Sequence, residues 1–359
     1  MGDEVGAGLL IGGWMGHGPQ PSEGEAGSTT MQRIERRIDV SEAAGLGEPV
    51  EMAVSIVLPD PADLPARPVA IFAVPGGGYS RAYYHLSFAG HEGYDEAAWH
   101  AARGTVHVAI DHVGVGESSI PDLSRISFQT LAATHDSCVR QVAAMIERGD
   151  LAPGFPARPG LFRVGMGQSM GGGVTILAQG RFASFDAIAP CGVSAIHTAL
   201  PQRNAEEFER GKRRFAEVSV GDASQSHLTT SHDGVDYVYP FHWEDVPADI
   251  LEADMVGGYP IRRTAPAFGS LTIPHCAVQM MTPGCFAEDA ARIAVPVLVA
   301  VGERDTCPDP RAEPSAYRAS PDIGVFIVPR MAHMHNFAST RELLWQRLHG
   351  WSRMLAATA

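Results

Sequence analysis

Three short apolar runs, each closed by glycine, constrain the fold of this chain more than any other feature of its sequence. They are RPVAIFAVPGGG (67–78), GTVHVAIDHVGVG (104–116) and GLFRVGMGQSMGGG (160–173). Such runs are typical of strands that are buried on both faces of a parallel sheet. Between the last two runs, residues 127–150 place apolar side chains at three-to-four spacing behind Ser127, a candidate N-cap. The alternation predicts an α/β fold, with a mostly parallel central sheet and helices on both faces.

The alternation is interrupted once, which predicts the domain organisation. Residues 195–290 are polar, aromatic and irregular, and strand-like runs resume at VPVLVAVGERD (295–305) and IGVFIVP (323–329). An interruption of about ninety residues far exceeds an ordinary connection. We therefore predict a core formed by residues 36–194 and 291–359, with residues 195–290 inserted as a cap or lid. Residues 1–35 are rich in Gly, Ser and Glu without a sustained period, and are predicted to form a flexible arm.

The net charge of the chain excludes two classes of partner. The chain carries 27 basic and 41 acidic residues, a net charge of −14, which argues against nucleic acid or an anionic membrane as a partner.

The five cysteines of the chain lack CxxC spacing, and no secretory signal or run of about 18 apolar residues is present, so a cytoplasmic location is expected. No metal site or cofactor is predicted. A small-molecule substrate is expected, and the glycine-rich arm makes a homo-oligomer possible.

The third apolar run ends in a G-x-S-x-G sequence, Gly167 to Gly171, with Ser169 at its centre. An apolar strand precedes this sequence and a helical pattern follows it, which is the setting of a nucleophile elbow. Flanking glycines allow a sharp turn in which the serine takes a strained conformation and its hydroxyl is exposed. Ser169 is therefore the candidate nucleophile.

A nucleophilic serine needs a base and an acid that orients the base, and both are expected at the ends of later strands. Asp305 follows the strand-like run VPVLVAVGER, with Asp309 as the alternative acid. His333 follows IGVFIVPRMA closely and is the favoured base, with His335 as its rival. The alternative interpretation of Asp305 is a carboxylate that caps a turn. The alternative interpretation of His333 and His335 is two surface histidines without a catalytic role.

Acyl transfer also needs hydrogen-bond donors for the developing oxyanion. The backbone N–H of Met170 is one candidate, and the glycines that follow the first run, Gly77 and Gly78, supply the other. Four side chains near these positions or in the insertion are predicted to bind substrate: Tyr79, Gln168, Tyr239 and Trp243. The aromatic and methionine residues of the insertion fit two interpretations equally, the lining of an apolar pocket or a small core of their own.

Together, these residues resemble the α/β-hydrolase superfamily. The PGGG sequence at 75–78 is similar to the family's HGGG-type oxyanion loop, with Pro75 in place of histidine, and DHVGVGES (111–118) resembles the loop after its fourth strand. The resemblance covers residues 49–195 and 291–357, and the insertion matches the position of a cap. It implies an esterase-like or lactonase-like Ser-His-Asp enzyme. A serine at the elbow argues against epoxide hydrolases and haloalkane dehalogenases, which have aspartate there.

The expected function is cleavage of a carboxylic ester or lactone of a mainly hydrophobic small molecule through an acyl-enzyme. Two alternatives stay open on the sequence. One is a carbon–carbon bond hydrolase or acyltransferase on the same fold. The other is a binding protein that keeps the fold without catalysis.

Overall fold

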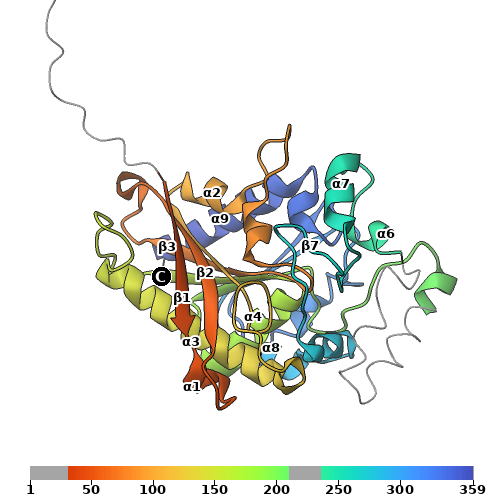
Figure 1. Ribbon diagram of the computed structural model, residues 1–359, viewed down its shortest axis with the longest axis horizontal. Coiled ribbons are helices and arrows are strands. Elements are labelled where there is room, and N and C mark those ends of the chain that lie inside the picture. The colour runs from red at the N-terminus through yellow and green to blue at the C-terminus, as the bar shows by residue number, and fades with distance from the viewer. Residues whose placement is uncertain (1–30, 210–235, 359) are drawn as a thin grey trace, which may run out of the picture.

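The computed structural model describes residues 31–209 and 236–358, and a single eight-stranded sheet runs through them (Figure 1). In chain order the strands are β1 (Gln32–Asp39), β2 (Glu51–Leu58), β3 (Val69–Val74), β4 (Thr105–Ile110), β5 (Phe162–Gln168), β6 (Ala187–Cys191), β7 (Val297–Gly302) and β8 (Ile323–Val328). Their order across the sheet is β1-β2-β4-β3-β5-β6-β7-β8. The first two pairings, β1 with β2 and β2 with β4, are antiparallel, and all the others are parallel.

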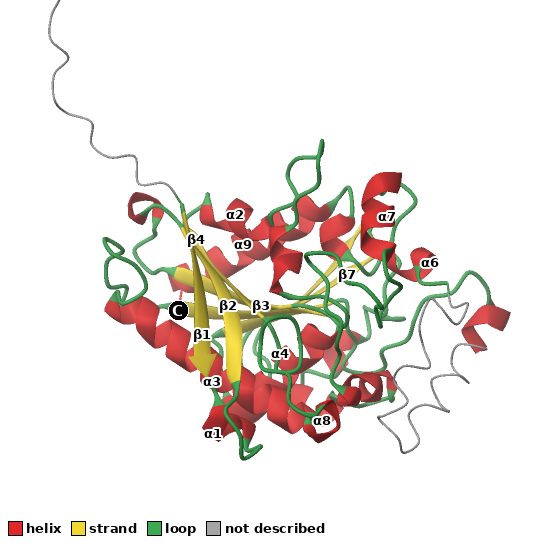
Figure 2. Cartoon of the chain, in the orientation of Figure 1, coloured by secondary structure: helices red, strands yellow, loops and turns green. Residues whose placement is uncertain are grey.

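Helices cover both faces of the sheet, as predicted (Figure 2). The helices whose bounds both lie within the described residues are α1 (Ser41–Ala44), α2 (Glu96–Ala101), α3 (Phe128–Arg148), α4 (Met170–Phe182), α6 (Val238–Phe241), α7 (Ala248–Met255), α8 (Ala287–Ala290) and α9 (Arg341–Thr358). Helices α1, α3, α4 and α8 pack on one face and share one apolar core with it. Helices α2 and α9 lie on the opposite face (Figure 1). Within the described ranges, no helix has both the length and the apolar character needed to cross a membrane.

Helix α3 shows how local sequence determines these elements. The Ser127 hydroxyl accepts a hydrogen bond from the N–H of Thr130, and the Thr130 hydroxyl accepts one from the N–H of Ser127, which completes a capping box. Gly149 ends the helix in a left-handed conformation, with φ of 77°. The predicted helix and its cap are therefore confirmed.

Two predicted boundaries differ from the structure. The arm was expected to extend to residue 35, yet β1 begins at Gln32 and pairs along its length with β2. The rest of that arm, residues 1–30, lies outside the described residues. At the other boundary, α8 falls inside the predicted insertion but packs against α4 of the core, where Asp289 binds Arg181.

The remaining described part of the insertion includes α6, α7 and the 3-10 helix η6 (His275–Met281). These elements follow β6 and precede β7, so they are inserted between two neighbouring parallel strands. Buried residues from this segment, among them Tyr237, Phe241 and Phe268, join one apolar cluster with residues of the sheet and of α9. The insertion therefore packs directly on the core.

Candidate active site

Ser169 lies in the tight turn between β5 and α4. Its φ is 55°, in the left-handed region that residues with a side chain seldom adopt. The turn packs tightly against β3, because a Cβ atom added to Gly171 would lie 2.2 Å from the carbonyl oxygen of Val74. The strained backbone directs the serine hydroxyl away from the sheet, as a nucleophile elbow requires.

A chain of hydrogen bonds connects this serine to a buried carboxylate. Nε2 of His333 lies 2.9 Å from the Ser169 hydroxyl oxygen, and Nδ1 of the same ring lies 2.6 Å from Oδ1 of Asp305. Ser169 follows β5, Asp305 follows β7 and His333 follows β8, so three parallel strands of the same sheet position the three groups. This arrangement can move a proton from the hydroxyl to an imidazole whose second nitrogen is bound to an anion.

His335, the alternative candidate for the base, binds the same Asp305 carboxylate. Nε2 of His335 lies 2.7 Å from Oδ2 of Asp305. That carboxylate also accepts hydrogen bonds from the backbone N–H groups of Gly302 and Thr306. Asp309, the alternative acid, is exposed and accepts a hydrogen bond from the N–H of Arg311. The structure therefore brings Asp305 to His333 and leaves Asp309 in a surface turn.

Burial and charge determine the protonation states of His333 and Asp305. Burial lowers the pKa of His333 below its usual value, and Asp305 offsets this effect only in part. Burial alone would raise the pKa of Asp305, but the imidazoles of His335 and His333 hold that pKa well below its usual range. At neutral pH, the site thus combines a neutral imidazole with an ionised carboxylate.

The loop after β3 passes beside the serine. A Cβ atom on Gly76 would lie 3.0 Å from the Ser169 Cβ. Within the described residues, the amide N–H of Gly77 and that of Met170 donate no hydrogen bond to another protein group. The N–H of Gly78 belongs to the peptide whose carbonyl, on Gly77, accepts a hydrogen bond from Tyr259. Because C=O and N–H are opposed across a trans peptide, the Gly78 N–H points away from Tyr259.

A cavity of about 120 Å³ opens beside these groups. It is lined by Gly77, Ser169, Met170, Thr198, Leu200, Tyr237, Phe241, Tyr259, Pro260, Ile261, Ile273, Ala277, Val278, Met280, Met281, Thr306 and His333. Most of these side chains are apolar, and many come from the insertion. The Phe241 ring packs 4.9 Å from the imidazole of His333, centroid to centroid. The insertion thus forms much of the wall opposite the serine.

Comparison with solved structures places this geometry in a known fold. An esterase from Thermogutta terrifontis matches with 15% identity over 91% of this chain and 99% of its own, with a TM-score of 0.57. A haloalkane dehalogenase variant from Bradyrhizobium elkanii matches with 14% identity over 92% and 98%, with a TM-score of 0.58. The chain has the α/β-hydrolase fold.

A bromoperoxidase from Bacillus anthracis shares the α/β-hydrolase fold too, with 13% identity over 90% of this chain and 100% of its own, and a TM-score of 0.54. The sequence matches no family model and no curated protein. The three proteins are named for different reactions, so the fold alone does not choose among them. The choice depends on the groups around Ser169.

None of the four predicted substrate-binding side chains is among the residues that line the cavity. Tyr79 is fully buried, with its hydroxyl bound to Asp254. The Gln168 amide donates to the carbonyl of His333, 2.8 Å away. Tyr239 and Trp243 both pack against the guanidinium of Arg304, at 4.1 and 4.6 Å. The prediction that these four side chains contact substrate is therefore not supported by the cavity beside Ser169. Gly78 is also buried and does not line the cavity.

Both interpretations of the insertion's aromatic and methionine residues are partly right. Five of them line the cavity: Tyr237, Phe241, Tyr259, Met280 and Met281. Phe268 instead packs in the apolar cluster shared with α9. Thr306, Ile273 and Ala277 also line the cavity. They could not be predicted from the sequence, because short and aliphatic residues carry no chemical signal of their own.

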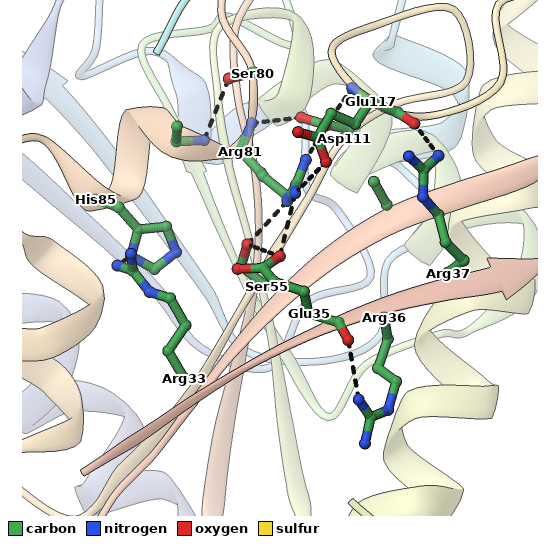
Figure 3. Close-up of polar contacts among 12 residues, drawn as sticks. Arg33, Glu35, Arg36, Arg37, Ser55, Ser80, Arg81, His85, Asp111 and Glu117 are labelled. Carbon is green, nitrogen blue, oxygen red and sulfur yellow. Dashed lines mark hydrogen bonds and ion pairs between the residues drawn. The ribbon is translucent and has the colours of Figure 1, made fainter. Parts of the chain in front are cut away.

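An ionic network holds the far end of the loop after β3 on the α/β-hydrolase core (Figure 3). The backbone N–H of Arg81 and its guanidinium both donate to the buried carboxylate of Asp111, which also accepts from the N–H of Glu117. The same guanidinium reaches Glu117 at 2.8 Å and Glu35 at 3.1 Å. Asp111 begins the DHVGVGES loop, so this loop and the start of the 3-10 helix η2 (Arg81–His85) are joined by charge.

Proposed function

We propose that this protein is a serine hydrolase that cleaves a carboxylic ester or lactone of a neutral, mainly apolar small molecule through an acyl-enzyme. The observation that carries the proposal is the chain of hydrogen bonds from Ser169 through His333 to Asp305, which ends at the apolar cavity. A hydroxyl, an imidazole and a carboxylate in this order are the parts that nucleophilic acyl transfer needs. A protein that only binds its ligand has no use for the arrangement.

In the first half of the reaction, the Ser169 Oγ attacks the carbonyl carbon while Nε2 of His333 takes the hydroxyl proton. Asp305 holds the ring in the tautomer that presents an unprotonated Nε2 and stabilises the imidazolium that forms. The negative charge moves to the carbonyl oxygen, where the N–H groups of Met170 and Gly77 stabilise it. The intermediate then expels the alcohol oxygen, which receives the proton from His333.

In the second half, a water molecule replaces the alcohol. His333 takes a proton from this water as its oxygen attacks the acyl carbon, and the oxyanion forms again at the same two N–H groups. Collapse of the intermediate breaks the bond to Ser169 Oγ, and His333 returns the proton to the serine. The products are an acid and an alcohol, or a hydroxy acid when the substrate is a lactone.

The cavity limits the substrate class. Among the described residues, its lining includes no Asp, Glu, Lys or Arg side chain, so a charged acyl group would lose its hydration without a counter-charge. A cavity of about 150 Å³ holds a benzene ring, and the space beside Ser169 is about 120 Å³. A neutral group of about four to six carbons is therefore the expected acyl part.

A labelling experiment tests the proposal. The protein and its Ser169→Ala variant are treated with a fluorophosphonate probe, and the modified peptide is mapped by mass spectrometry. Labelling of the first and not the second is expected. Equal labelling of both, or none of either, contradicts the proposal. Turnover of p-nitrophenyl esters, lactones and vinylogous diketones then separates ester and lactone cleavage from carbon–carbon bond cleavage.

A further inference from the structure

The insertion holds the oxyanion loop through two consecutive carbonyl groups. The Tyr259 hydroxyl donates to the carbonyl of Gly77, at 2.9 Å, and Nε of Arg262 donates to the carbonyl of Gly78, at 3.1 Å. The two segments touch closely, because a Cβ atom on Gly78, where φ is +84°, would lie 2.7 Å from the carbonyl oxygen of Pro260. Direct hydrogen bonds therefore connect the insertion to the backbone beside the nucleophile.

Arg262 is fixed in turn by a buried carboxylate. Its side chain is fully buried, and one of its terminal nitrogens lies 3.0 Å from Oδ1 of Asp254. The Asp254 carboxylate also accepts hydrogen bonds from the Tyr79 hydroxyl, at 2.7 Å, and from His242, at 2.8 Å. Since Tyr79 follows Gly78 directly in the chain, both ends of this network return to the oxyanion loop. A buried charge pair with several further hydrogen bonds has a defined geometry.

Peptide geometry connects this network to catalysis. The carbonyl of residue i and the N–H of residue i+1 share one rigid plane. Hydrogen bonds to the carbonyls of Gly77 and Gly78 therefore fix the two peptide planes that follow the N–H of Gly77. Glycine has no Cβ atom to restrict its own torsion angles. The Gly77 N–H belongs to the preceding peptide, whose carbonyl, on Gly76, accepts a hydrogen bond from the Tyr79 N–H at 3.3 Å. The external bonds therefore act on the donor through the torsion angles of Gly77 and through this turn.

We propose that Tyr259 and Arg262 are positioning residues for the oxyanion hole, anchored by Asp254. They hold the loop so that the Gly77 N–H faces the carbonyl oxygen of the substrate. Transition-state stabilisation then depends on contacts made by the insertion. This inference rests on the proposed serine hydrolase function.

The test uses Tyr259→Phe, which keeps the ring and removes the bond to the loop. The control is Tyr317→Phe, which removes a hydroxyl from a buried tyrosine of the core cluster. Loss of a whole oxyanion donor lowers kcat by about 10²–10³-fold. A displaced donor should lower kcat by roughly 10–100-fold, with KM changed less than about threefold. The control should keep wild-type kcat and KM.

A transition-state analogue provides the second measurement. A short-chain alkyl trifluoromethyl ketone forms a hemiketal with Ser169, and the oxygen of that hemiketal occupies the oxyanion hole. The inhibition constant should rise in Tyr259→Phe by the same factor by which kcat/KM falls. Arg262→Lys, which keeps the positive charge and loses the Nε–H donor, should show the same proportionality.

The results separate this inference from the proposed function. If the wild-type protein labels at Ser169 and hydrolyses esters while Tyr259→Phe keeps full kcat, the positioning role is wrong. A loss that falls on KM alone, or a drop in kcat/KM with unchanged affinity for the trifluoromethyl ketone, also overturns it. Failure of the wild-type protein to label at Ser169 instead overturns the proposed function.

Discussion

The carboxylate of Asp305 binds two imidazoles, and this arrangement determines how the site should respond to pH. Its two oxygens accept from His333 and His335 at 2.6 and 2.7 Å. Burial lowers the pKa of His333, so the base is neutral at pH 7 and becomes protonated only in more acidic solution. A protonated imidazole cannot accept the proton of Ser169.

Activity should therefore be present at neutral pH and lost as the pH falls through the lowered pKa of His333. We expect kcat/KM, measured for a neutral p-nitrophenyl ester between pH 4 and 8 (about the range in which histidine titrates), to fall with a midpoint below the usual histidine value of about 6.5. A neutral substrate ensures that the profile of kcat/KM reports the free enzyme. A midpoint above 6.5 would contradict the assignment of a buried His333 as the base.

The two histidines should differ sharply on substitution. His333→Ala removes the base and should lower kcat/KM by about 10³-fold or more, as expected for a triad member. His335→Ala leaves the base in place and removes one donor to Asp305, so its effect on kcat/KM should be much smaller. Unfolding experiments should show a loss of about 1–3 kcal/mol for His335→Ala, because a buried carboxylate oxygen loses one of its two donors and keeps only the N–H of Gly302.

His335→Gln is the matched control, since its amide can donate to the same carboxylate oxygen. It should recover part of the stability lost in His335→Ala. If His335→Ala reduces kcat/KM more than His333→Ala does, the base has been misassigned.

The order in which the three proposed catalytic residues occur could be predicted because each follows an apolar strand. Parallel strands end at one edge of the sheet, so residues that follow β5, β7 and β8 come together there. The predicted contact of Tyr79 with substrate is not supported, because the position of Tyr79 depends on a contact that is distant in the sequence. Its orientation is set by Asp254, which lies 175 positions later in the chain. Contacts over such a distance leave no local pattern.

Among the elements, the buried parallel strands were predictable and β1 was not. The strands β3, β4 and β7 are buried at every position, so β3 and β7 read as continuous apolar runs and β4 is mostly apolar. By contrast, β1 has the sequence QRIERRID and is exposed at six of its eight positions. Edge strands commonly carry charged residues, which discourage pairing with other chains. Its sequence therefore resembles an arm.

The capping box of α3 offers a test of local stability that is independent of catalysis. Ser127→Ala removes the side-chain acceptor for the N–H of Thr130 and should destabilise the protein by about 0.5–2 kcal/mol in chemical denaturation. Ser127→Gly should lose only a few tenths of a kcal/mol, since glycine is tolerated at an N-cap. Both variants should retain wild-type kcat and KM. An alanine variant as stable as the wild type would show that the cap contributes nothing.

Considered as one body, the molecule has an insertion that shares an apolar core with the rest of the chain. The Tyr79 ring lies 5.5 Å from that of Tyr259, and the Phe337 ring lies 5.5 Å from that of Phe268. Replacing the insertion with a short linker would expose these rings to water, so it would test folding more than selectivity. A single substitution in the cavity wall is the sharper experiment.

Ala277 is suited to that substitution, because it lines the cavity and carries the smallest side chain on η6. Ala277→Leu replaces a methyl group with an isobutyl group and should fill part of the space for the acyl chain. Discrimination in an apolar pocket is about 10–200-fold per methylene group. We therefore expect kcat/KM for p-nitrophenyl butyrate and hexanoate to fall at least about tenfold relative to the acetate.

Val256→Leu, at an exposed position of the same insertion, is the matched control and should leave the ratio of butyrate to acetate unchanged. The wild-type protein should prefer esters that fill the cavity, since each buried methylene group contributes about 0.8 kcal/mol to binding. The cavity is bounded by Ser169 on the core and by Ala277 on the insertion. The preference for acyl chain length therefore measures the space between the core and the insertion. An Ala277→Leu variant with the wild-type chain-length profile would show that the acyl group binds elsewhere, and the cavity would lose its assigned role.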